Sequence, residues 1–274
     1  MREVRFEMLR PGEIQQEKEK CSVAYLPIGP LEWHGPHLPL GVDPLNAQAV
    51  AVRLAQKNGG VTLPTLYWGT ERERSPEMLK NIGFNGDEWI VGMDFPANSM
   101  KSLYATEDAF AIAVREYLRL LATQDYKLIV IVNGHGATNH IYTLKRLAAE
   151  FTETTTSTVY YTMATFFDSS IQDLLGHATK TETSIMAHIH PESVDTSTLP
   201  PEGEKMRNID YGIVDSEAFN GRANEDFTVI HDPRDFDAQT GCKLIEYSVE
   251  VISTKIQELL KGEMQRENHK NNWT

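Results

Sequence analysis

A short segment rich in Gly and Pro, residues 26–43, carries four side chains of types that bind metal ions: Glu32, His34, His37 and Asp43. Neutral imidazole suits zinc, manganese or iron, whereas carboxylates suit harder divalent cations and can bridge two of them. Glu32 and His34 are two residues apart, so in an extended chain they leave the same face. A turn-rich link could fold Asp43 back toward them. The segment therefore predicts half of a two-metal hydrolytic site, although any one of these residues alone would fit a solvated loop equally well.

The elements around this segment place it at the end of a strand. The apolar run 23–28 stops at a Gly-Pro pair, which predicts a buried strand that leads into the segment. A second apolar run, 127–132, predicts a central strand and is followed by the motif Asn-Gly-His-Gly. Ligands bind beyond the carboxyl ends of strands in a parallel α/β sheet, so His135 lies where a functional histidine is expected. The neighbouring Gly136 lets the backbone approach a substrate closely, and the alternative for His135 is a structural, hydrogen-bonded histidine.

A third polar segment contains His177 and Glu182. The unperturbed pKa of histidine, about 6.5, lies near neutrality, so His177 could act as a general acid or base. Glu182 could complete a metal shell or orient water. Taken alone, a His and a Glu five residues apart near a helix start are usually a helix cap and a solvated residue. The interpretation of this segment therefore depends on the other two.

Strands and helices alternate along most of the chain. The predicted strands cover residues 23–28, 61–67, 127–132 and 157–163, and the predicted helices cover 44–58, 106–123, 140–151 and 240–261. This alternation implies βαβ units, so the predicted fold class is α/β: a three-layer α/β/α sandwich with a mainly parallel central sheet covered on both faces. Two irregular stretches remain. Residues 70–98 could form a lid or a subunit contact, and residues 202–237 predict loops with short strands.

Length and composition favour one domain, residues 1–274, with a substantial core, because 41% of the residues are hydrophobic. The formal charge of −13, from 26 Lys and Arg against 39 Asp and Glu, repels polyanions, so no nucleic acid partner is expected. No run approaches about 20 apolar residues and no signal peptide is evident, so no membrane partner is expected. Two isolated cysteines, Cys21 and Cys242, fit a cytoplasmic location. The absence of a phosphate-binding loop and of a Gly-x-Ser-x-Gly elbow gives nucleotide hydrolysis and serine catalysis no support.

The three segments together resemble the creatininase family of amidohydrolases. The matching motifs, in order, are Glu32-Trp-His-Gly-Pro-His-Leu-Pro-Leu with Asp43, Asn133-Gly-His-Gly, His177 with Glu182-Thr-Ser, and Asp232-Pro-Arg-Asp followed by Gly241. The resemblance implies that Asp43 bridges two divalent ions, Zn and/or Mn, or Fe. Glu32 and His135 would complete one shell, and His34 would belong to the other. The implied reaction is hydrolysis of a cyclic or linear amide C–N bond by metal-activated water, with His177 moving a proton to the departing nitrogen.

One position departs from the pattern of true creatininases. These enzymes place a metal-binding Glu two residues after the equivalent of His135, where this chain has Ala137. By resemblance to family members with a glycine-rich version of this loop, we assign the missing ligand to Glu182. Creatininases also carry Trp and Glu just before the equivalent of His177, where this chain has Asp-Leu-Leu-Gly at 173–176. The pocket should therefore differ from that of an enzyme acting on creatinine.

The expected substrate is a small-molecule amide, and the resemblance also implies a homo-oligomer, expected to be a hexamer. Trp33 and Thr70 are candidate substrate contacts, although burial in the core explains a Trp more often than stacking on substrate does. His37 is expected beside the site, in a structural hydrogen bond. Alternatives within the family are a formamide deformylase and a peptidase that trims a modified peptide. A metal-binding homologue without catalytic activity is a further alternative, because of Ala137.

Overall fold

The computed structural model describes residues 2–81, 84–96, 98–167, 176–204, 208–209, 212–213 and 232–271. Five parallel strands form the central sheet: β1 (Val23–Gly29), β2 (Val61–Thr62), β3 (Leu66–Tyr67), β4 (Leu128–Asn133) and β5 (Thr158–Met163). The strand order is β2-β1-β4-β5, and β3 pairs with β1 beyond the end of β2. β1 and β4 pair from Val23 opposite Leu128 to Ile28 opposite Asn133. Their carboxyl ends therefore lie at the same edge of the sheet.

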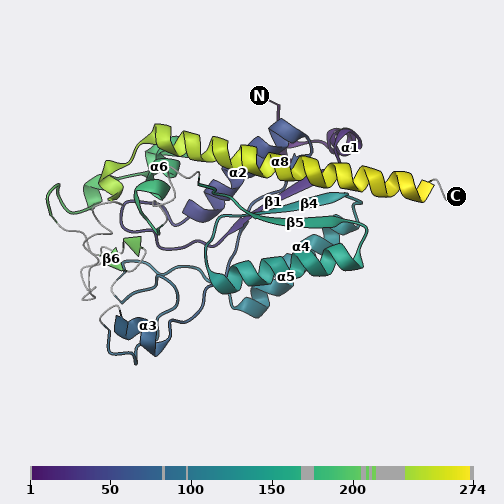
Figure 1. The fold of residues 1–274 in the computed structure, drawn as a ribbon. Coiled ribbons are helices and arrows are strands. Elements are labelled where there is room, and N and C mark those ends of the chain that lie inside the picture. The colour runs from purple at the N-terminus through teal and green to yellow at the C-terminus, as the bar shows by residue number, and fades with distance from the viewer. Residues whose placement is uncertain are drawn as a thin grey trace.

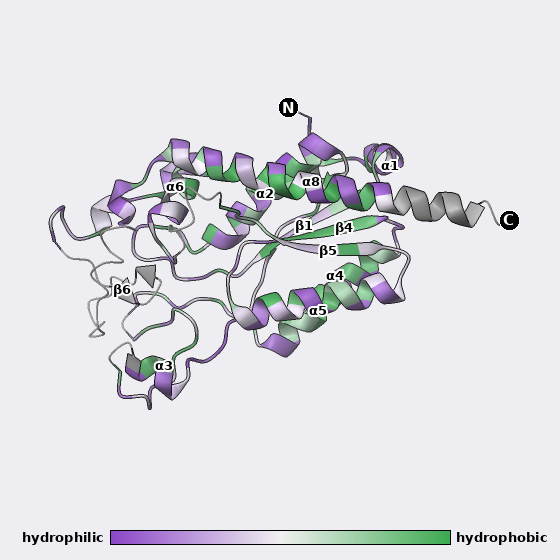
Figure 2. Ribbon diagram, in the orientation of Figure 1, coloured by the Kyte–Doolittle hydropathy of each residue, from purple (hydrophilic) through white to green (hydrophobic). Residues whose placement is uncertain are grey.

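Helices cover both faces of this sheet, which confirms the predicted three-layer α/β/α sandwich (Figure 1). α2 (Val42–Asn58) and α8 (Ala238–Asn271) lie on one face, and α4 (Glu107–Ala122) and α5 (Thr138–Thr154) lie on the other. Alternate strand residues point to opposite faces, so Tyr25 and Val130 pack toward α2 and α8, whereas Leu26 and Ile129 pack toward α4 and α5. Burial on both faces explains why these strands are continuously apolar, as the green colour of β4 in Figure 2 shows.

The remaining elements surround this core. α1 (Pro11–Lys20) precedes β1 and was not predicted, and α3 (Pro76–Asn81) lies within the stretch that was predicted to be irregular. α6 (Lys180–Ile189) packs against α8. The short elements are η1 (Phe6–Met8), η3 (Pro191–Ser193), η4 (Thr196–Thr198), η5 (Pro233–Asp235), β6 (Asn208–Ile209) and β7 (Gly212–Ile213). Most of the stretch 202–237 lies outside the described residues. Among the helices described, none is both long and apolar enough to cross a membrane.

The predicted strand 61–67 is wrong in one respect, because the structure divides it into β2 and β3. Two prolines remove backbone donors there, Pro64 within the interruption itself and Pro27 in the neighbouring strand β1. Gly134 N donates to Ile28 O, so the backbone groups of Ile28 face β4 and those of Pro27 face the opposite neighbour. Leu63 N still donates to Tyr25 O, but Pro27 has no N–H to offer next along the strand. The pairing is interrupted there and resumes with β3.

Candidate metal centre

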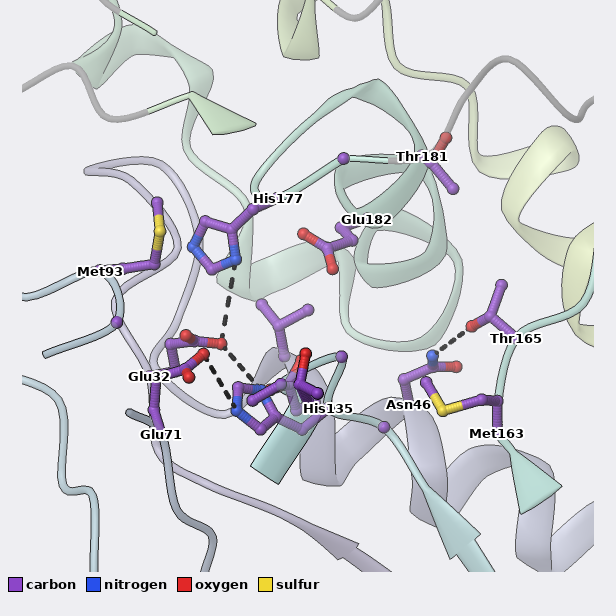
Figure 3. Close-up of a pocket in the computed structure, with 18 of the residues that line it drawn as sticks. Glu32, Asn46, Glu71, Met93, His135, Met163, Thr165, His177, Thr181 and Glu182 are labelled. Atoms are coloured by element: carbon purple, nitrogen blue, oxygen red, sulfur yellow. Dashed lines mark hydrogen bonds and ion pairs between the residues drawn. The ribbon is translucent and has the colours of Figure 1, made fainter. Parts of the chain in front are cut away.

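Four predicted ligands meet at the carboxyl ends of β1 and β4, and Figure 3 labels two of them, Glu32 and His135. Glu32 and His34 follow β1, His135 follows β4, and Asp43 lies in the first turn of α2. His135 Nδ1 is 2.9 Å from Asp43 Oδ2 and 3.2 Å from Glu32 Oε2. His34 Nε2 is 3.4 Å from Asp43 Oδ1. All four side chains are buried, so two carboxylates and two imidazoles face one another with little solvent between them.

The contact between these segments depends on Gly134. A Cβ atom at this position would lie 2.0 Å from the carbonyl oxygen of Asp43, a distance that real Cβ atoms essentially never show. Gly134 N also donates to Ile28 O at 3.0 Å, which joins the end of β4 to β1. The missing side chain therefore lets the end of β4 touch the start of α2, and this contact brings His135 to Asp43.

The segment that leads into α6 adds His177 and Glu182 to the same cluster (Figure 3). Glu182 lies in the first turn of α6, and its Oε2 is 3.8 Å from His34 Nε2. His177 Nε2 donates to Trp33 O at 2.5 Å, which leaves Nδ1 on the side of Glu32, 3.9 Å from Glu32 Oε2. The structure thus brings together all six side chains that the sequence marked as ligands or catalytic groups.

Two groups of three potential ligands share Asp43. The groups are Glu32 with Asp43 and His135, and His34 with Asp43 and Glu182. A third group combines Glu32 and His34 with His177 and does not contain Asp43. Within each group the ligand atoms lie within 4.8 Å of one another. His34 Nδ1 donates to the carbonyl oxygen of Glu32 at 3.0 Å, so a neutral His34 has its lone pair on Nε2. That buried nitrogen has no hydrogen-bond partner among the described residues. Divalent cations would satisfy it and the carboxylates around it, so these residues fit two ions that share Asp43.

The charges of the clustered side chains shift several pKa values. Burial disfavours a charged His34, but the carboxylates of Glu182 and Asp43 outweigh burial and raise its pKa to about 10. Burial raises the pKa of Glu182 to about 7. Burial, together with the nearby His34, lowers the pKa of His177 to about 4, so His177 is neutral near pH 7. Because metal ligands must be deprotonated, His34 and Glu182 would release protons when ions bind.

Three further residues contact the cluster and were missed by the sequence predictions. Tyr104 donates to Glu32 Oε1 at 2.5 Å, and no motif around Tyr104 indicates this role. Glu71 Oε2 lies 4.0 Å from His135 Nε2. The ring of His140 lies against that of His135, with centroids 5.0 Å apart. For His140 a signal was available, since it follows His135 by five residues at the start of the next helix.

A cavity of about 700 Å³ opens beside the cluster. Its wall contains five of the six clustered side chains, all except His34. Apolar side chains make up much of the rest: Val42, Met78, Met93, Met163, Phe166, Phe167 and Ile185. The cluster therefore faces a space that can hold a substrate with an apolar part.

The predicted substrate contacts have different positions relative to this cavity. Gly136 lines it. Trp33 and Thr70 are not among its described lining residues: Trp33 packs in an apolar cluster with Phe95, and Thr70 N donates to His140 Nδ1. His37 lies beside the cluster, where its Nε2 donates to Thr183 Oγ1 at 3.1 Å.

The fold and the site define an α/β protein whose sheet gathers carboxylates and imidazoles at the carboxyl ends of its central strands. The chain belongs to the creatininase family, because the family model described as creatinine amidohydrolase matches residues 7–256. The family predicted from the sequence motifs is therefore confirmed.

Two relatives of known name are similar over part of their length. The chain is 30% identical over 187 residues to a mycofactocin precursor peptide peptidase from Mycolicibacterium smegmatis, which covers 68% of this chain and 65% of that protein. It is 28% identical over 130 residues to a creatinine amidohydrolase from Pseudomonas putida, which covers 45% of this chain and 44% of that protein. The chain thus spans less than two thirds of the length of either relative.

Solved structures of creatininases share the fold. A structure named "Creatininase Mn" aligns with a TM-score of 0.66 at 22% identity and covers 94% of this chain and 98% of that chain. A mutant creatininase of "Zn-Zn type" aligns with a TM-score of 0.65 at 22% identity over the same shares of the two chains. At this level of identity the likeness establishes the α/β architecture.

Proposed function

We propose that this chain is a metal-dependent amidohydrolase that cleaves an amide C–N bond with metal-activated water. The observation that carries the proposal is the position of Asp43, whose two carboxylate oxygens face different histidines. Oδ2 is 2.9 Å from His135 Nδ1, and Oδ1 is 3.4 Å from His34 Nε2. A carboxylate between two imidazoles can bridge two divalent ions.

The remaining ligands follow from the same geometry. Glu32 would complete the shell of the ion bound by His135, and Glu182 would complete the shell of the ion bound by His34. Glu182 supplies the carboxylate that Ala137 does not provide. Zinc and manganese, the metals named for two structures of similar fold, both suit this mixed nitrogen and oxygen donor set.

When bound, the two ions supply Lewis-acid activation of water and of the amide carbonyl. The side chains around them hold and move protons. His177 is neutral near pH 7, because burial lowers its pKa to about 4, and its bond to Trp33 O leaves Nδ1 free. His177 therefore takes a proton from the attacking water and passes it to the departing nitrogen. Glu182, also in the cavity wall, accepts a hydrogen bond that orients the same water.

The cavity supports a second candidate for the substrate. A volume of about 700 Å³ exceeds what a small ring fills and lies in the range typical of larger ligands. Met93, Phe166 and Phe167 make part of its wall apolar. We therefore propose peptide trimming as a second candidate activity, in addition to hydrolysis of a small non-peptide amide. The mycobacterial relative is named as a precursor peptide peptidase.

Metal analysis of the purified protein tests this proposal. We expect two ions per chain in the wild type, and loss of both metal and amide hydrolysis in Asp43→Ala, because Asp43 faces both shells. Asp108→Ala removes an exposed carboxylate in the first turn of α4 and should retain both properties. A panel of lactams, formamides and peptides then identifies the substrate class. A wild-type protein that binds no metal would refute the proposal, and tight metal binding without turnover on the whole panel would support a non-catalytic homologue.

The assembly and location follow from the resemblance to the family and from composition. We infer that residues 1–274 act as one domain and assemble as a homo-oligomer, expected to be a hexamer. Cys21 and Cys242 are both free, in keeping with a cytoplasmic protein. Light scattering on the eluting protein during size-exclusion chromatography measures the oligomeric state, and a monomer at micromolar concentration would contradict it.

A further inference from the structure

His140 uses both ring nitrogens to join segments that flank the metal centre. It lies in the first turn of α5, is fully buried and stacks on Phe110 at a centroid distance of 4.4 Å. Thr70 N donates to His140 Nδ1 at 3.3 Å. Because a backbone N–H can only donate, Nδ1 carries the lone pair and Nε2 carries the hydrogen. His140 Nε2 therefore donates to Asn133 Oδ1, at 3.0 Å.

Asn133 passes this constraint on to His135. Its Oδ1 also accepts from His135 N at 2.9 Å, and its Nδ2 donates to His135 O at 2.7 Å. The amide group thus holds the backbone of His135 from both sides. The N–H of His140, together with the N–H and the carbonyl group of His135, sets how the amide is turned, because the rotated amide would place Nδ2 against two donors.

The ring of His140 also contacts the ring of His135 directly. The two centroids are 5.0 Å apart and the ring planes meet at 87°, which is an edge-to-face arrangement. On the other side of His140, Thr70 precedes Glu71, whose Oε2 lies 4.0 Å from His135 Nε2. His140 therefore holds the backbone of His135, one edge of its ring and the segment that carries Glu71.

We propose that His140 is a positioning residue that orients His135 so that its Nδ1 faces Glu32 and Asp43. The inference rests on the proposed metal-binding function and adds to it a residue outside the ligand set. Groups that orient a histidine ligand change metal affinity by about 10–100-fold when they are removed. Removing His140 should therefore weaken metal binding even though it touches no ion.

Three substitutions separate the two hydrogen bonds of His140 from its packing. His140→Phe keeps a ring that can stack on Phe110 and removes both hydrogen bonds. His140→Gln can still donate at the position of Nε2, toward Asn133, whereas His140→Asn can still accept at the position of Nδ1, from Thr70 N. His190→Gln, in an exposed part of the chain, is the control for loss of an imidazole.

Binding of Co²⁺ to the metal-free variants, measured by calorimetry and by the visible absorption of bound Co²⁺, provides the test. For His140→Phe we expect a Kd about 10–100-fold above that of the wild type and altered Co²⁺ bands. His140→Gln should bind nearly as the wild type does, and His140→Asn should resemble the Phe variant, because only Gln keeps the bond to Asn133 Oδ1. The melting temperature, measured in parallel, shows whether each variant folds.

The possible results are distinguishable. Wild-type affinity and spectrum in a folded His140→Phe would overturn the inference, and so would equal losses in His140→Gln and His140→Asn. If His140→Phe does not fold, the comparison of the Co²⁺ affinities of His140→Gln and His140→Asn decides alone. A wild-type protein that binds no Co²⁺ would overturn the proposed function and this inference with it. If the wild type binds Co²⁺ and the His140 variants bind it equally well, only the inference is overturned.

Discussion

Gly134→Ala tests whether the contact between β4 and α2 builds the metal centre. The added Cβ would lie 2.0 Å from the carbonyl oxygen of Asp43 and 2.6 Å from its carbonyl carbon. Real Cβ atoms stay at least 3.0 Å from such neighbours, so the two segments must separate by about 1 Å. Gly134 N is bonded to Ile28 O, so the displacement falls mainly on the start of α2, which carries Asp43.

The magnitude follows from the two consequences of this displacement. Extra volume in a packed interior costs about 1–3 kcal/mol of unfolding free energy. A misplacement of about 1 Å in a catalytic group can lower the rate about 100-fold. For Gly134→Ala we therefore expect a lower free energy of unfolding in urea and a loss of bound metal that exceeds what the stability change alone would cause. Urea titration and metal analysis on the same preparation measure both quantities.

Gly136→Ala is the matched control, because a Cβ at this position meets nothing within 4 Å. It lies in the same loop, two residues further on, and should change the free energy of unfolding by less than about 0.5 kcal/mol with metal binding retained. The reasoning is refuted if Gly134→Ala binds metal and resists urea as the wild type does. Equal impairment of both variants would refute it as well, since loop flexibility rather than the contact with Asp43 would then explain the loss.

Three other predictions concern the site and the scaffold. Tyr104→Phe removes the donor to Glu32 Oε1 and should weaken metal binding by about 10–100-fold while the protein stays folded; an unchanged Kd from calorimetry would contradict this. In EDTA, the nearby carboxylates outweigh burial and raise the pKa of His34 in the folded protein to about 10, and the pKa of His135 is also raised. The folded protein therefore keeps a proton on His34 that the unfolded chain releases near pH 6.5. The melting temperature should therefore fall as pH rises between these values, and saturating Zn²⁺ should remove the fall; a flat metal-free profile argues against the shift. Thr106→Ala removes the hydroxyl that caps α4 and should cost about 1 kcal/mol in urea unfolding with metal binding unaffected.

The residue types at the candidate site could be predicted because each motif is a short local pattern. Each one also lies beside an apolar run that strongly predicts a strand. Glu32 and His34 follow an apolar run that ends in Gly-Pro, and His135 follows another that ends in Asn-Gly. The structure places both motifs at the carboxyl ends of adjacent parallel strands. Strand position is a local property of the sequence, which is why the place of these motifs at strand ends could be predicted.

Residues outside the motifs could not be predicted in the same way. Glu71 lies in the irregular stretch 70–98, and Tyr104 lies between that stretch and the predicted helix 106–123. Neither segment has a periodic pattern from which to derive the path of its backbone. Trp33 is adjacent to two proposed ligands in sequence, yet its side chain packs with Leu79 and Phe95 away from the described cavity wall. The division of the strand 61–67 depends on Pro27, in a different strand, as well as on Pro64 within the segment.

The sequence by itself determined the α/β class, the family and the kinds of side chain at the site, because periodicity and ligand type are carried by neighbouring residues. Only the tertiary structure decided which atoms face one another. The sharing of Asp43 between His34 and His135 depends on β1 lying beside β4 and on the contact that Gly134 permits with the start of α2. Distances between segments so far apart in the chain are set by strand order and packing, and neither is written in a local pattern.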